Sequence, residues 1–291
     1  MTSTTAGRII PRRRRRPIRL AGVLIAVGLA VLLVFELYPL VWLFISSFKT
    51  QNEFNTEPFW SLPATFSFDN YVQAWTSGNV AQYAVNSVLA VVPALFFLVV
   101  LGTAAAFALE VMVWKGRAGV LLYFLAGVMV PAQMILLPLF NVYFRTGLTG
   151  TLWPLIITYT ALGLPLTTFL LATYFRAIPR EVFEAATLDG ASIYRQFFSV
   201  GIPMIRNAIA TVLLVQFFFL WNDLLIAYTF TTSAKLRTIQ VGLLAFNGQY
   251  GSVDWGPLFA AISINVFGTL VIYLALNQQI MKGLTAGSVK G

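Results

Sequence analysis

Apolar residues occur in six long runs along the chain, separated by shorter polar segments. An α-helix needs about 20 apolar residues to cross the ~30 Å hydrocarbon core of a bilayer. The first run is longer than the apolar core of a signal peptide, about 7 to 15 residues, so we expect it to be retained as a helix. We therefore predict an all-α membrane protein with six transmembrane helices, at about residues 20–45, 83–113, 119–144, 152–175, 205–230 and 257–281.

Three polar segments are long enough to have structures of their own. Residues 48–82 combine mixed charge with Trp60, Tyr71 and Trp75, which favours a small external lobe at the membrane interface. Residues 231–256 form a second, glycine-rich external loop. The third segment, residues 179–203, is the long polar insertion between the fourth and fifth runs. We expect a basic tail at 1–19, a permease domain at 20–281 and a short tail at 282–291.

The composition agrees with a membrane protein. Hydrophobic residues make up 58% of the chain and charged residues only 10%, against about 25% charged in soluble domains, and the mean hydropathy is +0.80. The net charge of +9 raises the question of nucleic-acid binding, but the basic residues cluster at the ends of apolar runs instead of forming one basic face. We expect membrane lipids as partners and no nucleic acid.

The missing residue types exclude most catalytic chemistry. The chain has no cysteine and no histidine, so it lacks disulfides, thiolate metal sites, Ser-His-Asp triads and imidazole proton relays. None of its lysines follows a glycine, so it has no phosphate loop of the GxxxxGK type. We expect no catalytic residue, no metal site and no cofactor bound by this chain. A membrane-embedded enzyme would need a clustered acidic pair, which the sequence does not show.

Basic residues also indicate the orientation. If the N-terminus is cytoplasmic, the external segments hold four of the 19 basic residues, and the other 15 lie on cytoplasmic segments. This asymmetry follows the positive-inside rule. We therefore predict that both termini and residues 179–203 face the cytoplasm. The four external residues are Lys49, Arg145, Lys235 and Arg237.

The 179–203 segment has the pattern of two short helices. Pro179 suits the first turn of a helix, and Gly190 suits the left-handed turn that ends it. A second helix is expected from about Ser192 until Gly201 and Pro203 end it. Helices this short are marginal alone in water, so they need the membrane domain or a partner with a groove. The alternative is an amphipathic hairpin on the lipid surface, which would favour more lysine and arginine.

The same segment resembles the EAA loop of binding-protein-dependent ATP-binding cassette importers, written EAAxxDGAxxxxxFxxIxxP. The resemblance implies a type I importer permease fold in which this cytoplasmic loop is a coupling helix that enters a cleft on the nucleotide-binding ATPase. It departs from the family pattern at Val200, which replaces isoleucine, and at Asn207, where many members have a second proline. The matching residues are Glu184, Ala185, Ala186, Asp189, Gly190, Ala191, Phe197 and Pro203.

Nearly the whole chain resembles the smaller membrane subunit of maltose-type carbohydrate permeases, through SSFKTQNEFNTEPFWSLP, DNYVQAW, WNDLL and the terminal GLTAGSVKG. The resemblance implies a bacterial inner-membrane protein that imports sugar and does not itself hydrolyse ATP. It implies three kinds of partner: a second permease subunit, two ATPase subunits that bind ATP and Mg²⁺, and an extracytoplasmic sugar-binding protein. It also implies an ATPase-contacting tail at Leu284, Thr285, Ala286 and Gly287, and a binding-protein loop at Asn247, Gly248, Gln249 and Tyr250.

Polar residues within the apolar runs are candidates for the substrate path. Amide and carboxylate groups can bind sugar hydroxyls, and polar groups at membrane depth usually face a bundle interior or a wet cavity. The candidates are Gln216, Asn222, Asp223 and Asn265. Hydrogen bonding between helices is the alternative for all four.

Two other kinds of transport remain open. Glycerol 3-phosphate or related phosphodiesters are alternative substrates within the same family. An ion-coupled secondary carrier is the alternative of another class, and it would use membrane carboxylates such as Glu36 and Asp223.

Overall fold

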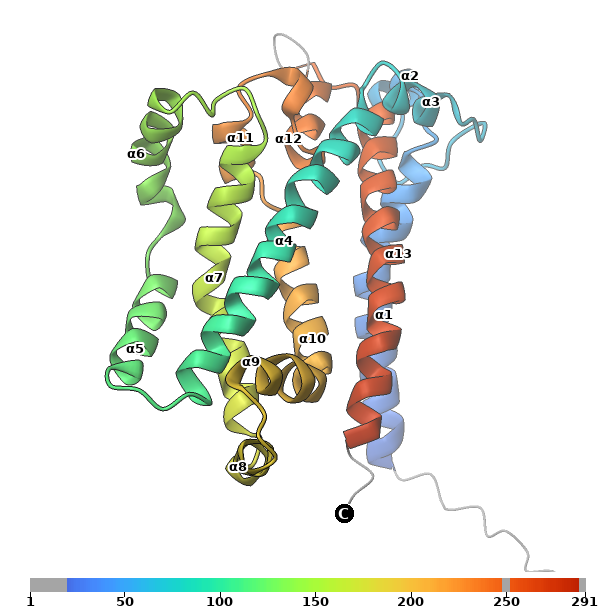
Figure 1. The fold of residues 1–291 in the computed structure, drawn as a ribbon. Helices are drawn as coiled ribbons and strands as arrows, with labels where there is room; N and C mark the ends of the chain where they lie inside the picture. Colours follow the sequence, from blue (N-terminus) through green and yellow to red (C-terminus); the bar gives the residue numbers. More distant parts are fainter. Residues whose placement is uncertain (1–19, 248–251, 288–291) are drawn as a thin grey trace, which may run out of the picture.

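The computed structural model describes residues 20–247 and 252–287, with side chains for 22–247 and 252–275. Five of its helices are long and apolar enough to cross a membrane, and a sixth span is formed if one bent pair is counted. The predicted all-α membrane fold is therefore confirmed. The five long helices stand side by side (Figure 1) and are α1 (Leu20–Ser46), α4 (Val80–Glu110), α7 (Trp153–Arg176), α10 (Ile202–Trp221) and α13 (Trp255–Gly287).

Two of the six predicted apolar runs contain an interruption that the sequence analysis did not locate. The run at 119–144 consists of α5 (Arg117–Val128) and α6 (Ala132–Arg145), whose axes differ by 95°. Pro131 lies between them; it has no backbone N–H and disfavours helical geometry in the preceding residue. In the run at 205–230, the helix ends at Trp221 and a new one, α11 (Leu225–Phe230), follows. The Asp223 carboxylate accepts a hydrogen bond from Ala227 N at 2.9 Å and so satisfies a free N–H in the first turn of α11.

α4 and α7 form the centre of the bundle. Small residues allow them to pack closely: a Cβ on Gly102 would lie 2.6 Å from the Thr167 methyl carbon. α10 packs against both helices, and its buried Gln216 bonds to α7. Interhelical contacts of this kind hold spans together in lipid, where burial of apolar surface gives little net driving force.

One end of the bundle carries two small helices after α1, namely α2 (Gln51–Thr56) and α3 (Asp69–Trp75). α12 (Ile239–Leu243), between the short 3₁₀ turns η2 (Ala234–Leu236) and η3 (Leu244–Phe246), lies at the same end (Figure 1). Gln51 ties the two parts together, because its side chain donates to Val253 O at 2.9 Å and accepts from Trp255 N at 3.0 Å.

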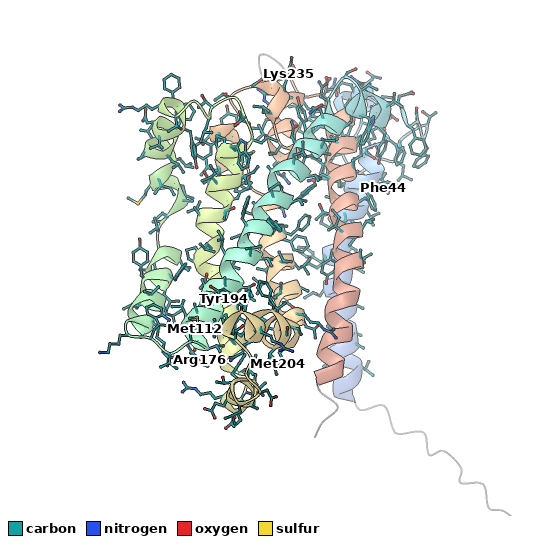
Figure 2. The ribbon with its side chains drawn as sticks, viewed as in Figure 1. Phe44, Met112, Arg176, Tyr194, Met204 and Lys235 are labelled. Atoms are coloured by element: carbon teal, nitrogen blue, oxygen red, sulfur yellow. The ribbon has the colours of Figure 1, made fainter. Side chains whose placement is uncertain are left out.

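The opposite end carries α8 (Arg180–Leu188) and α9 (Ile193–Gln196), together with the first residues of α1 and the last of α13 (Figure 1). Figure 2 shows Tyr194 and Met204 at this end and Lys235 at the other. The 179–203 segment thus lies on the same side of the bundle as the start of the first helix and the end of the last. This is the relative arrangement that the count of basic residues requires.

Candidate functional site

α8 and α9 form a compact helical hairpin within the 179–203 segment. α8 ends in a paired turn: Ala191 N donates to Ala186 O at 2.9 Å and Gly190 N to Thr187 O at 3.0 Å. Gly190 adopts the left-handed φ of +76° that this turn needs, as its sequence position predicts. Ser192 then caps α9 by accepting a hydrogen bond from Arg195 N.

The second helix does not end at Gly201 and Pro203, contrary to the sequence expectation. α9 continues without a break through the π-helical segment η1 (Phe197–Gly201) into α10. The N–H of Ile202 donates to Phe197 O five residues earlier, and Pro203, which has no N–H to donate, follows this wider turn as the second residue of α10. The 179–203 segment is therefore continuous with a membrane helix.

An aromatic cluster packs the hairpin against the bundle. Phe107 of α4 lies 5.5 Å from Phe175 of α7, 5.9 Å from Phe183 of α8 and 5.1 Å from Phe197 of η1, measured between ring centroids. All three are edge-to-face contacts, the arrangement that aromatic rings favour. Gly201 allows this approach, because a Cβ there would lie 3.2–3.3 Å from the rings of Phe175 and Phe107. We call Phe107, Phe175, Phe183 and Phe197 the aromatic node.

Gln196 closes the hairpin from inside. It is buried, and its Nε2 donates to Thr187 Oγ1 at 2.9 Å and to Ala191 O at 3.1 Å. Thr187 in turn donates to Phe183 O, so the hydrogen bonds lead from α9 to the node. The two short helices are thus joined to each other by Gln196 and to the parent bundle by the aromatic node.

The outward face of α8 is left exposed. Glu181, Glu184 and Leu188 follow one another at helical spacing on this face, and Leu188 is 88% exposed. Tyr194 and Phe198 add exposed aromatic surface from the next segment. Of the other predicted residues, Ala185, Asp189 and Pro203 are exposed, Ala186, Ala191 and Phe197 are half-buried, and Gly190 is exposed at the turn.

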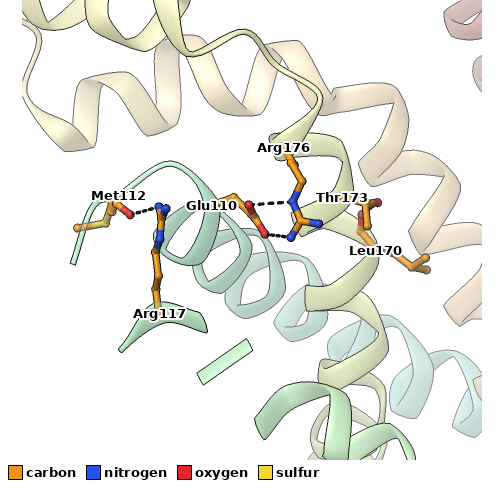
Figure 3. Close-up of polar contacts among 6 residues, drawn as sticks. All are labelled: Glu110, Met112, Arg117, Leu170, Thr173 and Arg176. Carbon is orange, nitrogen blue, oxygen red and sulfur yellow. Dashed lines mark hydrogen bonds and ion pairs between the residues drawn. The ribbon is translucent and has the colours of Figure 1, made fainter. Parts of the chain in front are cut away.

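A cavity of about 510 Å³ lies between α8 and the turn that joins α4 to α5. Its wall contains Glu184 and an ion pair between Arg176, the last residue of α7, and Glu110, the last residue of α4 (Figure 3). Arg117 donates to Met112 O in the same turn at 3.2 Å (Figure 3). The ends of α4 and α7 and the start of α5 therefore lie together beside the α8–α9 hairpin.

The four substrate-path candidates do not converge on one cavity. Gln216 Nε2 donates to Gly163 O at 3.1 Å and to Thr167 Oγ1 at 2.9 Å, and Asp223 caps α11 while accepting from the Tyr159 hydroxyl. Asn265 accepts from the Trp221 indole at 3.0 Å. These three side chains therefore form hydrogen bonds between helices or at a helix start, and hydrogen bonding between helices was the alternative to a place in the substrate path.

Asn222 is placed differently from the other candidates. It is exposed and lines, with Asn265, Phe218 and Tyr273, a cavity of about 370 Å³ between α10 and α13. Its Oδ1 accepts from Gln240 Nε2 at 3.2 Å. Among the candidates, Asn222 and Asn265 are thus the pair that shares an open cavity.

The two other predicted contact segments are only partly described. Asn247 pairs with Val253 across the base of its loop, whereas Gly248, Gln249 and Tyr250 lie outside the described residues. The backbone of Leu284, Thr285, Ala286 and Gly287 continues α13, and their side chains also lie outside the description. These assignments stay predictions.

Sequence reasoning did not find the inner partners of the hairpin. Phe107 and Glu110 have no recognisable spacing to the motif, and Phe107 lies 76 residues before Phe183 in the chain. The only local sign was Gln196 itself, a polar residue on the side of α9 that faces α8.

Comparison with known proteins adds independent findings. Residues 98–280 match the family described as "Binding-protein-dependent transport system inner membrane component". A diacetylchitobiose uptake system permease protein of Streptomyces coelicolor is 36% identical over 258 residues, covering 88% of this chain and 85% of that protein. A trehalose/maltose transport system permease protein of Thermococcus litoralis is 28% identical, covering 94% of this chain and 98% of that protein.

A solved structure shares the fold. It belongs to a bacterial ABC transporter involved in the import of the acidic polysaccharide alginate, and the likeness covers 92% of this chain and 99% of that one. The TM-score is 0.77 at 20% sequence identity. At that identity the likeness establishes the arrangement of helices alone.

Proposed function

The chain belongs to the family of binding-protein-dependent transport system inner membrane components, and from this we propose that residues 179–203 couple it to a nucleotide-binding ATPase. The single observation that carries the proposal is the continuity of the hairpin with the bundle. Its outward face presents Glu184 and Leu188, while its inward face is joined to α4, α7 and α10 through the aromatic node. A force on the exposed face therefore acts on three spans together.

The proposed cycle is one of alternating access driven from outside this chain. Closure of a dimer of ATPase subunits, which bind ATP and Mg²⁺, would shift the hairpin, and the spans would tilt with it as rigid bodies. This chain would form half of the path and a second permease subunit the other half. We infer no catalytic step on this chain itself, since it has no phosphate loop.

The proposed cargo is a carbohydrate delivered by an extracytoplasmic binding protein. The names of the relatives support it, because they refer to diacetylchitobiose and to trehalose and maltose. The alternative of an ion-coupled carrier gains no support from its two carboxylates: Glu36 lies on the exposed surface of α1, and Asp223 caps α11. Glycerol 3-phosphate remains the alternative within the family.

The proposed orientation places the α8–α9 end in the cytoplasm. The positive-inside count and the location of α8 at the same end as the start of α1 support it. The lobe formed by α2 and α3 would then face outward, as would the loop around Asn247.

Charge reversal tests the coupling proposal. The chain is co-assembled with the second permease, the ATPase and the binding protein, and ATP hydrolysis is measured with and without loaded binding protein. Glu184→Lys is expected to abolish the stimulated hydrolysis while the complex still assembles. Lys235→Glu, a charge reversal at the opposite end, serves as the matched control and is expected to leave it intact. Normal stimulation in Glu184→Lys would show that the hairpin is not the coupling element.

The cavity beside Asn222 offers a second test, of the substrate path. Asn222→Ala is expected to raise the concentration of loaded binding protein and sugar needed for half-maximal uptake, because a hydrogen-bonding group is lost from an open cavity. Gln216→Ala removes a buried amide whose donors are both satisfied by α7, so it is expected to lower the thermal stability instead. Equal changes in uptake affinity for both variants would rule out the assignment of Asn222.

A further inference from the structure

Residues 231–246, the first part of the predicted external loop, are attached to α4 by buried hydrogen bonds. Asn86 of α4 is 3% exposed, and its Nδ2 donates to Lys235 O at 2.8 Å and to Arg237 O at 3.0 Å. Its Oδ1 accepts from Gln82 Nε2 at 3.1 Å, one helical turn earlier. Both N–H groups of this amide are therefore used on the loop, and its oxygen is held by α4 itself.

The next residue of α4 fixes α12. Ser87 is 1% exposed and accepts a hydrogen bond from Ile239 N at 2.8 Å, which satisfies a free N–H at the start of α12. Tyr83 lies on the same face of α4 and packs closely on the loop, since a Cβ on Gly242 would lie 2.1 Å from its ring. These contacts are buried by this chain alone. The 231–246 segment cannot shift against α4 without losing them.

The opposite end of α4 carries the central ring of the aromatic node. Phe107 lies 21 residues after Asn86. This separation is about 30 Å along the helix axis, close to the thickness of the hydrocarbon core. α4 stays helical over the whole stretch, although Pro93 removes one of its backbone hydrogen bonds. Figure 1 shows α4 crossing from the end that carries α12 to the end that carries α9. One helix thus joins the 231–246 segment to the α8–α9 hairpin.

We propose that Asn86 and Ser87 are positioning residues that make α4 the link between the binding protein and the ATPase. The inference rests on the proposed function, in which the external loop meets the sugar-loaded binding protein and the hairpin meets the ATPase. A displacement of the 231–246 segment is then passed along α4 to Phe107, and through the aromatic node to the hairpin. Coupling between two binding sites is reciprocal, so closure of the ATPase also acts on the segment.

α10 offers a competing connection. It is continuous with η1 of the hairpin, and Asn222, which follows its last residue, accepts a hydrogen bond from Gln240 of α12 at 3.2 Å. This contact is exposed, in contrast with the buried contacts of Asn86 and Ser87. Gln240→Ala removes it and leaves the contacts of α4 in place. The two connections can therefore be tested separately.

The experiment measures ATP hydrolysis by the assembled transporter at increasing concentrations of sugar-loaded binding protein. It gives a basal rate, a maximal stimulated rate and the concentration for half-maximal stimulation. Asn86→Leu removes both hydrogen bonds to the loop with a side chain of similar size, and Ser87→Ala removes the bond to α12. Tyr143→Phe is the matched control, because it removes a buried hydroxyl bond between α6 and α7 without touching the loop. Gln240→Ala and Glu184→Lys are measured in the same series.

Both α4 variants are expected to keep the basal rate and the half-maximal concentration of the unsubstituted complex, whereas the maximal stimulated rate falls several-fold. Tyr143→Phe and Gln240→Ala should leave all three values unchanged. This pattern separates a positioning role from two simpler ones. Loss of a direct contact with the binding protein would raise the half-maximal concentration, and a general loss of stability would lower the basal rate as well.

Three outcomes would overturn the inference: full stimulation in both α4 variants, a change in the half-maximal concentration alone, or an equal loss of basal and stimulated hydrolysis. A loss in Gln240→Ala without one in Asn86→Leu would assign the connection to α10. Glu184→Lys distinguishes the two proposals. If it keeps the stimulation, the coupling proposal fails; if it loses the stimulation while both α4 variants keep it, only the role of α4 is wrong. Since the two α4 variants are independent, failure of one to assemble leaves the other to decide.

Discussion

Replacing Phe107 by alanine should separate the coupling hairpin from the membrane helices. Phe107 is 3% exposed and is the one ring of the aromatic node that contacts the other three. Two of these contacts, with Phe183 and Phe197, lead directly to the hairpin. Removal of the ring therefore leaves α8 and η1 without their shared partner on α4.

The magnitude follows from those contacts. An edge-to-face aromatic pair contributes about 0.5–1.5 kcal/mol beyond the area that it buries, so the two pairs to the hairpin contribute about 1–3 kcal/mol. A free-energy difference of about 1.4 kcal/mol corresponds to a factor of ten in an equilibrium constant. The ratio of molecules with the hairpin packed on the bundle to molecules with the hairpin detached should therefore fall roughly 5- to 150-fold. Phe175 and Ile205 belong to the same buried cluster and still pack against the hairpin in the variant, so we expect a decrease near the lower end of this range.

The assay compares hydrolysis and uptake in one preparation. Proteoliposomes with the Phe107→Ala transporter are expected to take up several-fold less sugar per ATP hydrolysed, because ATPase movements no longer reach α4. Phe96→Ala is the matched control: Phe96 lies on the same helix, is 63% exposed and is expected to leave the ratio unchanged. Phe107→Leu should restore part of the sugar uptake per ATP hydrolysed. An unchanged ratio in Phe107→Ala, or an equal loss in Phe96→Ala, would refute the role of the node.

Three further changes have expected outcomes. Gly190→Ala forces a left-handed φ of +76° on a residue with a Cβ, which costs about 1–2 kcal/mol and should lower binding-protein-stimulated ATP hydrolysis. Gly242→Ala would place a Cβ 2.1 Å from the Tyr83 ring, so the thermal midpoint of the purified complex should fall by the equivalent of about 1–3 kcal/mol. The pKa of Glu53 is lowered in the folded protein, chiefly because Ala64 N donates a hydrogen bond to its carboxylate. The stability that this group contributes is therefore complete above its unfolded pKa and is lost as the pH falls through the lower folded pKa. Glu53→Gln should abolish this loss of thermal stability at acid pH.

Controls for these three changes come from the same chain. Gly28→Ala meets no atom within 4 Å on α1 and should leave both hydrolysis and the thermal midpoint unchanged. Glu57→Gln removes an exposed carboxylate beside Glu53 and should preserve the acid-side loss. If either control matched its test variant, the change would reflect a general loss of stability.

The parts of the fold that could be predicted depend on local signals. The length of each apolar run determines whether a span exists, and proline, glycine and serine mark the ends of α8 and the start of α9 within a few residues. The left-handed turn at Gly190 was predictable because it depends on one residue type at one position. These features need no knowledge of what packs against them.

The two interruptions were not predictable from the same signals. The two helices on either side of Pro131 together pass as one apolar span, and membrane helices often contain proline without a break, so the proline alone does not predict the interruption. At Asp223 the decisive interaction is the cap that its carboxylate provides for α11, together with the Tyr159 hydroxyl from α7. Such a partner, 64 residues away, is known only from the packed structure.

The continuity of η1 with α10 changes how the coupling segment should be understood. A hairpin that ended at Pro203 could move independently of the membrane helix that follows it. Phe197 has two roles: its ring packs on Phe107 in the node, and its backbone carbonyl accepts the hydrogen bond from Ile202 N across the π turn at the base of α10. We therefore expect any rotation of α8 to be accompanied by movement of α10, and the geometry of the π turn to influence how far the span moves.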